Sequence, residues 1–177
     1  MKETEILNII KNYLNIEDVS VDKIPNIDLY MDQVTTFIED SLNEHKRDDN
    51  QKIITKTMVN NYVKDGIIPS PNKKKYNKNH LISLILIYYL KSIISINDIK
   101  LILKDRQENI EDIYNNFLKY KNNEKEKLYN DLKNLLDNIE KDKKNEIDLI
   151  TFLIAIIDEA NKKKFFAEKI IDLYFKD

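Results

Sequence analysis

The chain has 177 residues, of which 42% are hydrophobic and 34% charged, and its formal net charge is −2. One glycine, three prolines and no cysteine exclude disulfide bonds and thiolate metal sites, and they favour helices joined by short polar loops over many short strands. No apolar run approaches the ~18 residues of a membrane span, and the start, MKETEILNII, lacks the apolar core of a secretory signal. We therefore expect an all-α protein of the cytoplasm that has no contact with a membrane.

Two amphipathic helices are predicted near the N-terminus, over residues 2–14 and 30–45. In both, apolar side chains recur at steps of three and four, which places them on one helical face. Residues 15–27, which include Pro25, are expected to form a linker, and residues 46–51 a polar connector.

A shorter helix is predicted from Lys56 to Asp65. Thr55 is its expected N-cap, because a threonine hydroxyl can accept from the free amides of the first helical turn. Gly66, the only glycine, is expected to end the helix, since the left-handed conformation costs other residues ~1–2 kcal/mol. The prolines at 69 and 71 then prevent the helix from resuming.

The next segment predicts a buried helix followed by a short one. Asn77 can cap a helix over residues 78–93, and the LISLILIYYL run within it is apolar nearly all round. Such a composition is typical of a helix that is buried on most sides. Ser95 can cap the second helix, over residues 96–103.

The C-terminal region, residues 105–177, carries four predicted helical segments, at about 108–120, 124–140, 146–161 and 163–176. Asn123 with Glu126 resembles a capping box, and Asn145 can cap the third segment. The apolar positions of residues 110–139 form two seams in different heptad registers, which favours a compact bundle over one long coiled coil. A monomeric core, a homodimer interface and a pocket for an unidentified effector are all open for this region.

Charge is segregated along the chain. Residues 52–100 carry nine lysines against two aspartates, for a charge of +7, whereas residues 1–51 carry −7 and residues 101–177 carry −2. A basic segment within an acidic chain is expected when one face meets a polyanion. The alternative is a lysine-rich loop that is simply solvated.

The predicted helix 56–65 presents polar and basic side chains around its apolar stripe: Lys56, Thr57, Asn60, Asn61 and Lys64. An asparagine can bond adenine at two points in the major groove, and a lysine reaches guanine or phosphate. These residues are therefore predicted to face the bases or phosphates of double-stranded DNA. The alternative for both asparagines is solvated surface.

A lysine-rich loop follows this helix. The ammonium groups of Lys73, Lys74 and Lys75 can neutralise phosphates, and each contact would add roughly one unit to the salt dependence of binding. Tyr76 can contact sugar or phosphate, or pack beneath the loop and position it. We expect the three lysines to hold the DNA backbone.

Three stretches, MVNNYVKDGIIP, KKKYNKNHL and SINDIKLIL, resemble the DNA-binding domain of MerR-type transcription regulators. That family runs threonine-isoleucine-arginine-tyrosine-tyrosine, a glycine-leucine stop, a proline, an arginine-x-tyrosine wing and a serine-leucine-x-glutamate-isoleucine helix. The resemblance implies a winged helix-turn-helix in which Tyr62 is a DNA-facing helix tyrosine, Gly66 the stop, and Lys74 with Tyr76 the wing pair. Asn60 stands where the family has a phosphate-contacting arginine.

A second resemblance is to an uncharacterised bacterial family, domain of unknown function 1836. It covers about residues 24–103 and rests on LYMDQVTTFIE, TKTMVNNYVKDG and the IYYLK–SI-DIK region; it implies no activity. Together these inferences divide the chain into an N-terminal helix and linker (1–27), a MerR-like winged helix-turn-helix domain (28–104) and a C-terminal helical bundle (105–177). The expected fold class is all-α, and a minimal two-stranded wing is the one sheet left open.

Catalysis is not expected. The chain has no cysteine nucleophile, His45 and His80 lack the spacing of a metal site, and a single glycine cannot build a glycine-rich phosphate loop. No metal and no cofactor are predicted. The main hypothesis is a sequence-specific DNA-binding transcriptional regulator. The alternative is a protein–protein interaction module on a winged-helix scaffold without specific DNA binding, supported by the acidic N-terminal segment and by Asn60.

Overall fold

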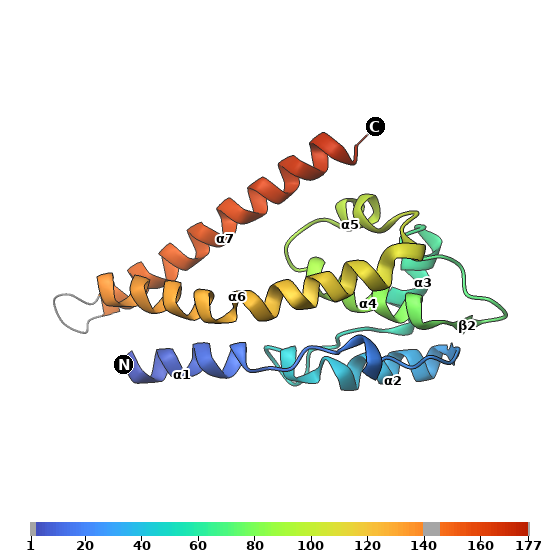
Figure 1. The fold of residues 1–177 in the computed structure, drawn as a ribbon, viewed down its shortest axis with the longest axis horizontal. Coiled ribbons are helices and arrows are strands. Elements are labelled where there is room, and N and C mark those ends of the chain that lie inside the picture. The colour runs from blue at the N-terminus through green and yellow to red at the C-terminus, as the bar shows by residue number, and fades with distance from the viewer. Residues whose placement is uncertain (1–2, 140–145, 177) are drawn as a thin grey trace. The chain divides into compact units, whose positions relative to one another are not determined.

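The computed structural model describes residues 3–139 and 146–176 and is mostly helical (Figure 1). Its helices are, in chain order, α1 (Glu3–Leu14), α2 (Met31–Ser41), α3 (Lys56–Lys64), α4 (Lys78–Leu90), α5 (Ile96–Leu103), α6 (Ile110–Ile139) and α7 (Glu146–Tyr174). Two short strands, β1 (Leu29–Tyr30) and β2 (Lys75–Tyr76), pair antiparallel, and single 3-10 turns cover Val21–Lys23, Asn43–His45 and Gln107–Asn109. The predicted all-α class with a minimal two-stranded sheet is confirmed. None of the helices described is both long and apolar enough to cross a membrane.

The described residues group into two compact units. The first, called the core unit below, lies within Asp18–Leu118 and Glu168–Asp177. The second, called the helical unit, lies within Met1–Glu17 and Lys119–Ala167. Helices α6 and α7 each continue from one unit into the other, so each of them contributes residues to both units.

Helix α4 lies at the centre of the core unit. Residues 80–87 are all buried, as their nearly continuous apolar run predicts. Helix α2 adds the buried side chains of Val34 and Ile38. Tyr114 of α6 is fully buried, and its hydroxyl donates to the carbonyl of Val19 at 2.7 Å, so the start of α6 is tied to the segment between α1 and α2.

The predicted N-caps of α3, α4 and α5 and the predicted end of α3 are confirmed. The side chains of Thr55, Asn77 and Ser95 accept from the backbone N–H groups of Met58, His80 and Asp98. Gly66 has a φ of +68°, the left-handed conformation predicted for it, and the next two amides donate to the carbonyl of Tyr62. Helix α4 ends at Leu90, three residues before the predicted boundary, and α2 ends at Ser41, where a 3-10 turn replaces the last predicted helical turn.

The largest correction concerns the C-terminal region, where two long helices replace the four predicted segments. Asn123 and Glu126 lie inside α6, so they do not form a capping box, and the predicted separation of residues 108–140 into two helices is wrong. The change of heptad register alters which face is buried without breaking the helix, because no glycine or proline lies in this stretch. Asn145 lies outside the described residues.

The change of seam in α6 falls near the boundary between the units. Before Lys119, Tyr114 and Phe117 pack into the core unit. After it, the buried Leu136 belongs to the helical unit, where α1 also contacts α6 through Lys11, whose Nζ lies 5.3 Å from the ring centroid of Tyr129. The buried Tyr114 and Leu136 therefore lie in two different packing environments along one helix.

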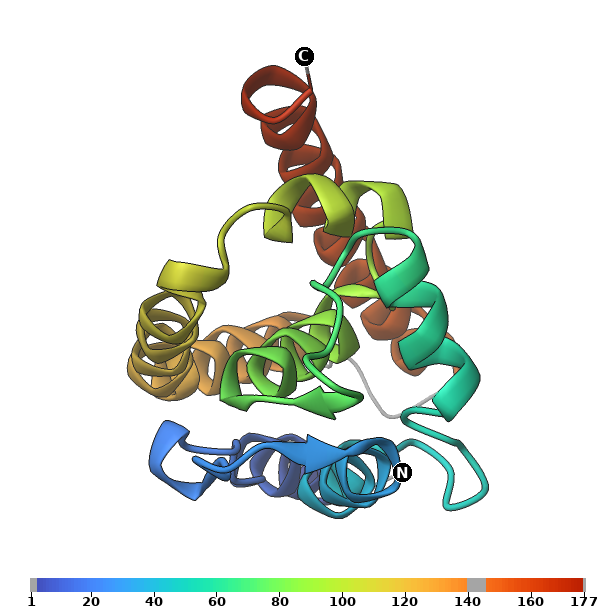
Figure 2. The ribbon, with the colours of Figure 1, turned by 90° about the vertical axis from the view of Figure 1, so that its right-hand side faces the viewer.

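The small sheet joins segments that are far apart in the sequence. Leu29 pairs with Tyr76 and Tyr30 with Lys75, and Figure 2 shows β1 beside β2, between α2 and α4. The loop between α3 and α4 is thereby fixed to the residues that precede α2. Helix α2 contacts α3, β1 and β2, so it connects the candidate recognition helix with the lysine-rich loop.

Candidate nucleic-acid interface

Helix α3 divides into a buried face and an exposed face. Val59 is fully buried, Tyr62 is 6% exposed, and Met58 is half-buried. The exposed face carries all five polar and basic residues of the predicted interface: Lys56, Thr57, Asn60, Asn61 and Lys64. The helical period that buries every third or fourth side chain thus leaves a continuous polar surface on the opposite side.

Tyr62 lies in the core and not on this exposed face. It shares the apolar stripe with Val59, and burial raises the pKa of its hydroxyl. The resemblance placed Tyr62 among the DNA-facing residues. Its position in the structure fixes α3 against the core unit.

The segment that enters α3 is held by a single carboxylate. Ile53 N–H and Ile54 N–H donate to Glu39 Oε1 at 2.9 and 3.1 Å, while Lys46 Nζ lies 3.0 Å from Glu39 Oε2. Lys91 Nζ donates to the carbonyl of Ile53 at 2.7 Å. Burial acts to raise the pKa of Glu39, but the amide of Ile54 and the contact with Lys46 outweigh it and hold the pKa below its usual value.

These contacts of Glu39 and Lys91 position α3 in the absence of a tight turn between α2 and α3. Residues 42–55 connect the two helices, whereas a helix-turn-helix joins them by about three or four residues. Ile53 and Ile54 are buried at the end of the connection, next to the Thr55 cap. The orientation of α3 therefore depends on Glu39 and on this buried pair.

The lysine-rich loop makes a two-residue turn. Lys75 N–H donates to the carbonyl of Asn72 at 2.9 Å, and the two central residues, Lys73 and Lys74, have φ values of 48° and 65°. Turns with two positive φ values normally use asparagine and glycine, because side chains with a Cβ are strained there. Two exposed lysines at these positions place both ammonium groups at the tip of the loop.

The base of the loop is buried. Tyr76 is 3% exposed and packs edge-on against His80, with ring centroids 5.4 Å apart, as expected for a tyrosine that packs beneath the loop. Lys75 Nζ lies 5.2 Å from the ring centroid of Tyr30. This contact between an ammonium group and an aromatic ring engages one of the three loop lysines and holds the loop against β1.

The lysines of the predicted interface differ in whether a carboxylate neutralises their charge. Lys56 forms an ion pair with Asp32 of α2. Within residues 3–139 and 146–176, the side chains of Lys64, Lys73 and Lys74 form no ion pair with a carboxylate. The uncompensated positive charge therefore lies at the C-terminal end of α3 and at the tip of the loop.

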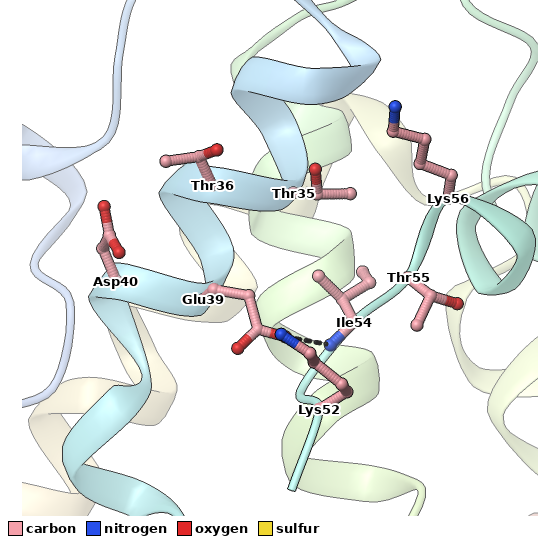
Figure 3. A pocket seen from close by; sticks show the side chains of 8 residues that line it. All are labelled: Thr35, Thr36, Glu39, Asp40, Lys52, Ile54, Thr55 and Lys56. Carbon is pink, nitrogen blue, oxygen red and sulfur yellow. Dashed lines mark hydrogen bonds between the residues drawn. The ribbon is translucent and has the colours of Figure 1, made fainter. Parts of the chain in front are cut away.

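An open groove of about 350 Å³ lies between α2 and the segment that enters α3 (Figure 3). Its lining residues are Thr35, Thr36, Glu39, Asp40, Lys52, Ile54, Thr55 and Lys56. The sequence gives no indication that α2 lies beside Lys56, since local patterns do not show which distant segments pack together. The acidic residues of α2 border the N-terminal end of α3, whereas its C-terminal end carries Lys64.

No group of three or more histidine, aspartate or glutamate side chains arranged to hold a metal ion occurs in the described part of the chain. His80 is buried, and its Nδ1 accepts from the backbone N–H of Asn77 at 3.1 Å, which completes the cap of α4. Its surroundings are those of a structural residue.

One protein family matches the chain: a family model described as Domain of unknown function (DUF1836) covers residues 19–132. No curated protein and no solved structure matches it. The matched region extends beyond residues 24–103, where the motifs lie, and continues into α6. It includes α3, the lysine-rich loop and the groove beside α2.

Proposed function

The chain belongs to the DUF1836 family, and we propose that it is a sequence-specific DNA-binding transcriptional regulator of MerR-like type. The observation that carries the proposal is the exposed polar face of α3 together with the uncompensated lysines at its C-terminal end and at the loop tip. Helix α2 packs on both α3 and β2, so the candidate recognition helix and the lysine-rich loop are held together in one unit. No catalytic activity is proposed.

In this proposal α3 enters the major groove. Asn60 and Asn61 read bases, since an asparagine amide can donate to and accept from one adenine edge. Lys64 reaches guanine or phosphate. Lys73 and Lys74 neutralise DNA backbone phosphates beside the major groove. They replace the phosphate contact that an arginine at position 60 would make in a MerR-type protein.

The test is binding of the full chain to the duplex upstream of its own gene, against a scrambled duplex of equal length, over a salt series. We expect a preference for the native duplex that survives ~150 mM salt. Replacing Lys73, Lys74 and Lys75 together by alanine should weaken binding to both duplexes and flatten the slope of log K against log salt by roughly two to three units.

A matched control is the triple alanine variant of Lys119, Lys127 and Lys133, which removes the same charge from exposed positions of α6. It should leave the slope nearly unchanged. Equal slopes for the two triple variants would reject the assignment of the loop lysines, and equal affinity for the native and scrambled duplexes would reject sequence-specific binding at this site.

The second candidate function is a protein–protein interaction module. It is favoured by the ion pair of Lys56 with Asp32 and by the carboxylates of Glu39 and Asp40 in the neighbouring groove, since these charges repel phosphates. A partner that remains bound to the chain after nuclease treatment and in high salt would support this function over DNA binding.

A further inference from the structure

A pocket of about 290 Å³ lies within the core unit, where the end of α3 meets the end of α5. Its walls come from two segments, residues 63 and 66–70 and residues 103–105 and 107, and it is called the α3–α5 pocket below. An apolar cavity of about 150 Å³ holds one benzene molecule. The α3–α5 pocket therefore suits one small organic molecule of roughly twice that size.

Four of the apolar side chains that line the pocket are buried or half-buried. Ile67, Ile68 and Leu103 are at most 2% exposed, and Val63 is half-buried. The amides of Ile67 and Ile68 both donate to the carbonyl of Tyr62, so hydrogen bonds fix this wall in the turn that ends α3. The wall is thus formed before any ligand arrives, as is usual for sites that bind small molecules.

Charged groups of both signs stand beside the apolar wall. Lys104 and Asp105 both line the pocket, and their Nζ and Oδ2 atoms are 3.9 Å apart. Both side chains are more than half exposed, so water screens their attraction and a ligand can compete for either group. Lys100, one turn earlier on α5, adds a second ammonium group, because its Nζ lies 4.0 Å from the position that a Cβ on Gly66 would occupy.

Gln107 adds a neutral polar group whose side chain is held by helix α4. The hydroxyl of the buried Ser83 has one proton, which it donates to the carbonyl of Asn79 at 2.9 Å. Ser83 Oγ therefore accepts from Gln107 Nε2, at 3.2 Å. Because the Nε2 of Gln107 is engaged in this way, its Oε1 is the atom that can accept from the N–H group of a ligand.

We propose that the α3–α5 pocket binds a free α-amino acid with an apolar side chain. The carboxylate of the ligand pairs with Lys104 and Lys100, its ammonium group pairs with Asp105 and donates to Gln107 Oε1, and its side chain packs on the apolar wall. A carboxylate without an ammonium group would be repelled by Asp105, and an amine without a carboxylate would be repelled by Lys104. The inference does not depend on the proposed DNA binding.

The first test is a titration of the isotopically labelled full chain with L-leucine, L-isoleucine, L-methionine and L-phenylalanine, followed by NMR up to about 10 mM ligand. We expect at least one of them to bind with a dissociation constant of roughly 1 mM or below. The amide signals that move should belong to residues 63–70 and 100–107. Glycine lacks the apolar side chain and should bind at least about tenfold more weakly.

Two analogues of leucine separate the contributions of its charges. Isocaproate lacks the ammonium group and isoamylamine lacks the carboxylate, so each should bind at least about tenfold more weakly than leucine. Isocaproate that binds as tightly as leucine would reveal a site for simple carboxylates and overturn the proposal. Failure of all four amino acids to bind, or movement of signals only outside the two segments, would overturn it as well.

Substitutions at the two charged lining residues complete the test. Lys104→Ala and Asp105→Asn should each weaken binding by roughly tenfold or more. Asp105 has a φ of 59°, a conformation that asparagine also tolerates, and both side chains are exposed, so both variants should fold. Lys52→Ala and Asp49→Asn remove the same charges from exposed positions outside the pocket and should leave the affinity unchanged. Equal affinities for the pocket variants and their controls would contradict the assignment.

Discussion

Helices α3 and α7 expose opposite chemistry for related physical reasons. In α3, one apolar stripe is buried and the rest of the helix is polar, so the core unit satisfies all of its hydrophobic surface. In α7, one stripe is buried and a second, with isoleucines at 47–69% exposure, remains in solvent. The comparison separates a surface suited to a charged, hydrogen-bonding ligand from one suited to an apolar helix.

The two helices also differ in how they are held. The entry to α3 is fixed by the Glu39 carboxylate and by the buried Ile53 and Ile54. The described start of α7, by contrast, buries the ring of Phe152 and leaves isoleucines exposed on another side. Hydrogen bonds specify the direction of a helix, whereas apolar contacts tolerate exchange of partners more readily.

The largest contrast is expected from truncating one apolar side chain in each helix. Val59→Ala removes two methyl groups from a fully buried site and should lower the free energy of unfolding by ~2 kcal/mol. Ile154→Ala, at a site that is 61% exposed, should change the free energy of unfolding by less than about 0.5 kcal/mol. Denaturant unfolding of each variant beside the unmodified chain measures both losses. Similar losses for the two variants would remove the distinction between the two faces.

The next effect concerns Glu39. Glu39→Gln keeps the shape but weakens acceptance from Ile53 and Ile54, and we expect a loss of about 1–2 kcal/mol near neutral pH. Because the folded protein lowers the pKa of Glu39, its contribution is complete above the unfolded value of about 4.3 and is lost as the pH falls through the folded value. The difference between variant and unmodified chain should therefore shrink in acid.

A suitable control for that experiment is Asp40→Asn, an exposed neighbour in the same groove. Its unfolding free energy should follow that of the unmodified chain at both pH values. A Glu39→Gln variant that loses no more stability than Asp40→Asn would show that the carboxylate does not hold the entry to α3.

A smaller effect, of opposite sign, is expected at the loop tip. Lys74 has a φ of 65°, so Lys74→Gly relieves left-handed strain and should raise the free energy of unfolding by about 1 kcal/mol. The same change removes one phosphate contact and should flatten the salt slope of DNA binding by roughly one unit. Lys52→Gly, an exposed lysine outside the turn, is the control for loss of charge alone.

The smallest effect on stability is expected for Asn60→Ala, less than about 0.5 kcal/mol, because the side chain is exposed. Its effect should appear in recognition, as a loss of discrimination between native and scrambled duplexes of roughly tenfold. Competition binding at constant salt measures this ratio. An unchanged ratio would remove Asn60 from the proposed reading face.

Local chemistry in the sequence is enough to predict much of the fold. A threonine, an asparagine and a serine that can bond free amides place the starts of α3, α4 and α5, and the only glycine marks the end of α3. The apolar run of α4 predicts its burial. Each of these signals depends on residues that are close together in the sequence, so no knowledge of distant contacts is needed.

The tertiary structure alone decides which distant groups meet and which face of a long helix is used. Glu39 reaches Ile53 and Ile54 across fourteen and fifteen positions, and Lys75 meets Tyr30 through strand pairing. The interrupted heptad register of residues 110–139 predicted two helices, yet one helix spans them and packs in two environments. Hydrogen bonding along a helix is local and can be read from neighbouring residues, whereas the partner of an apolar face is set by the packing of the whole chain.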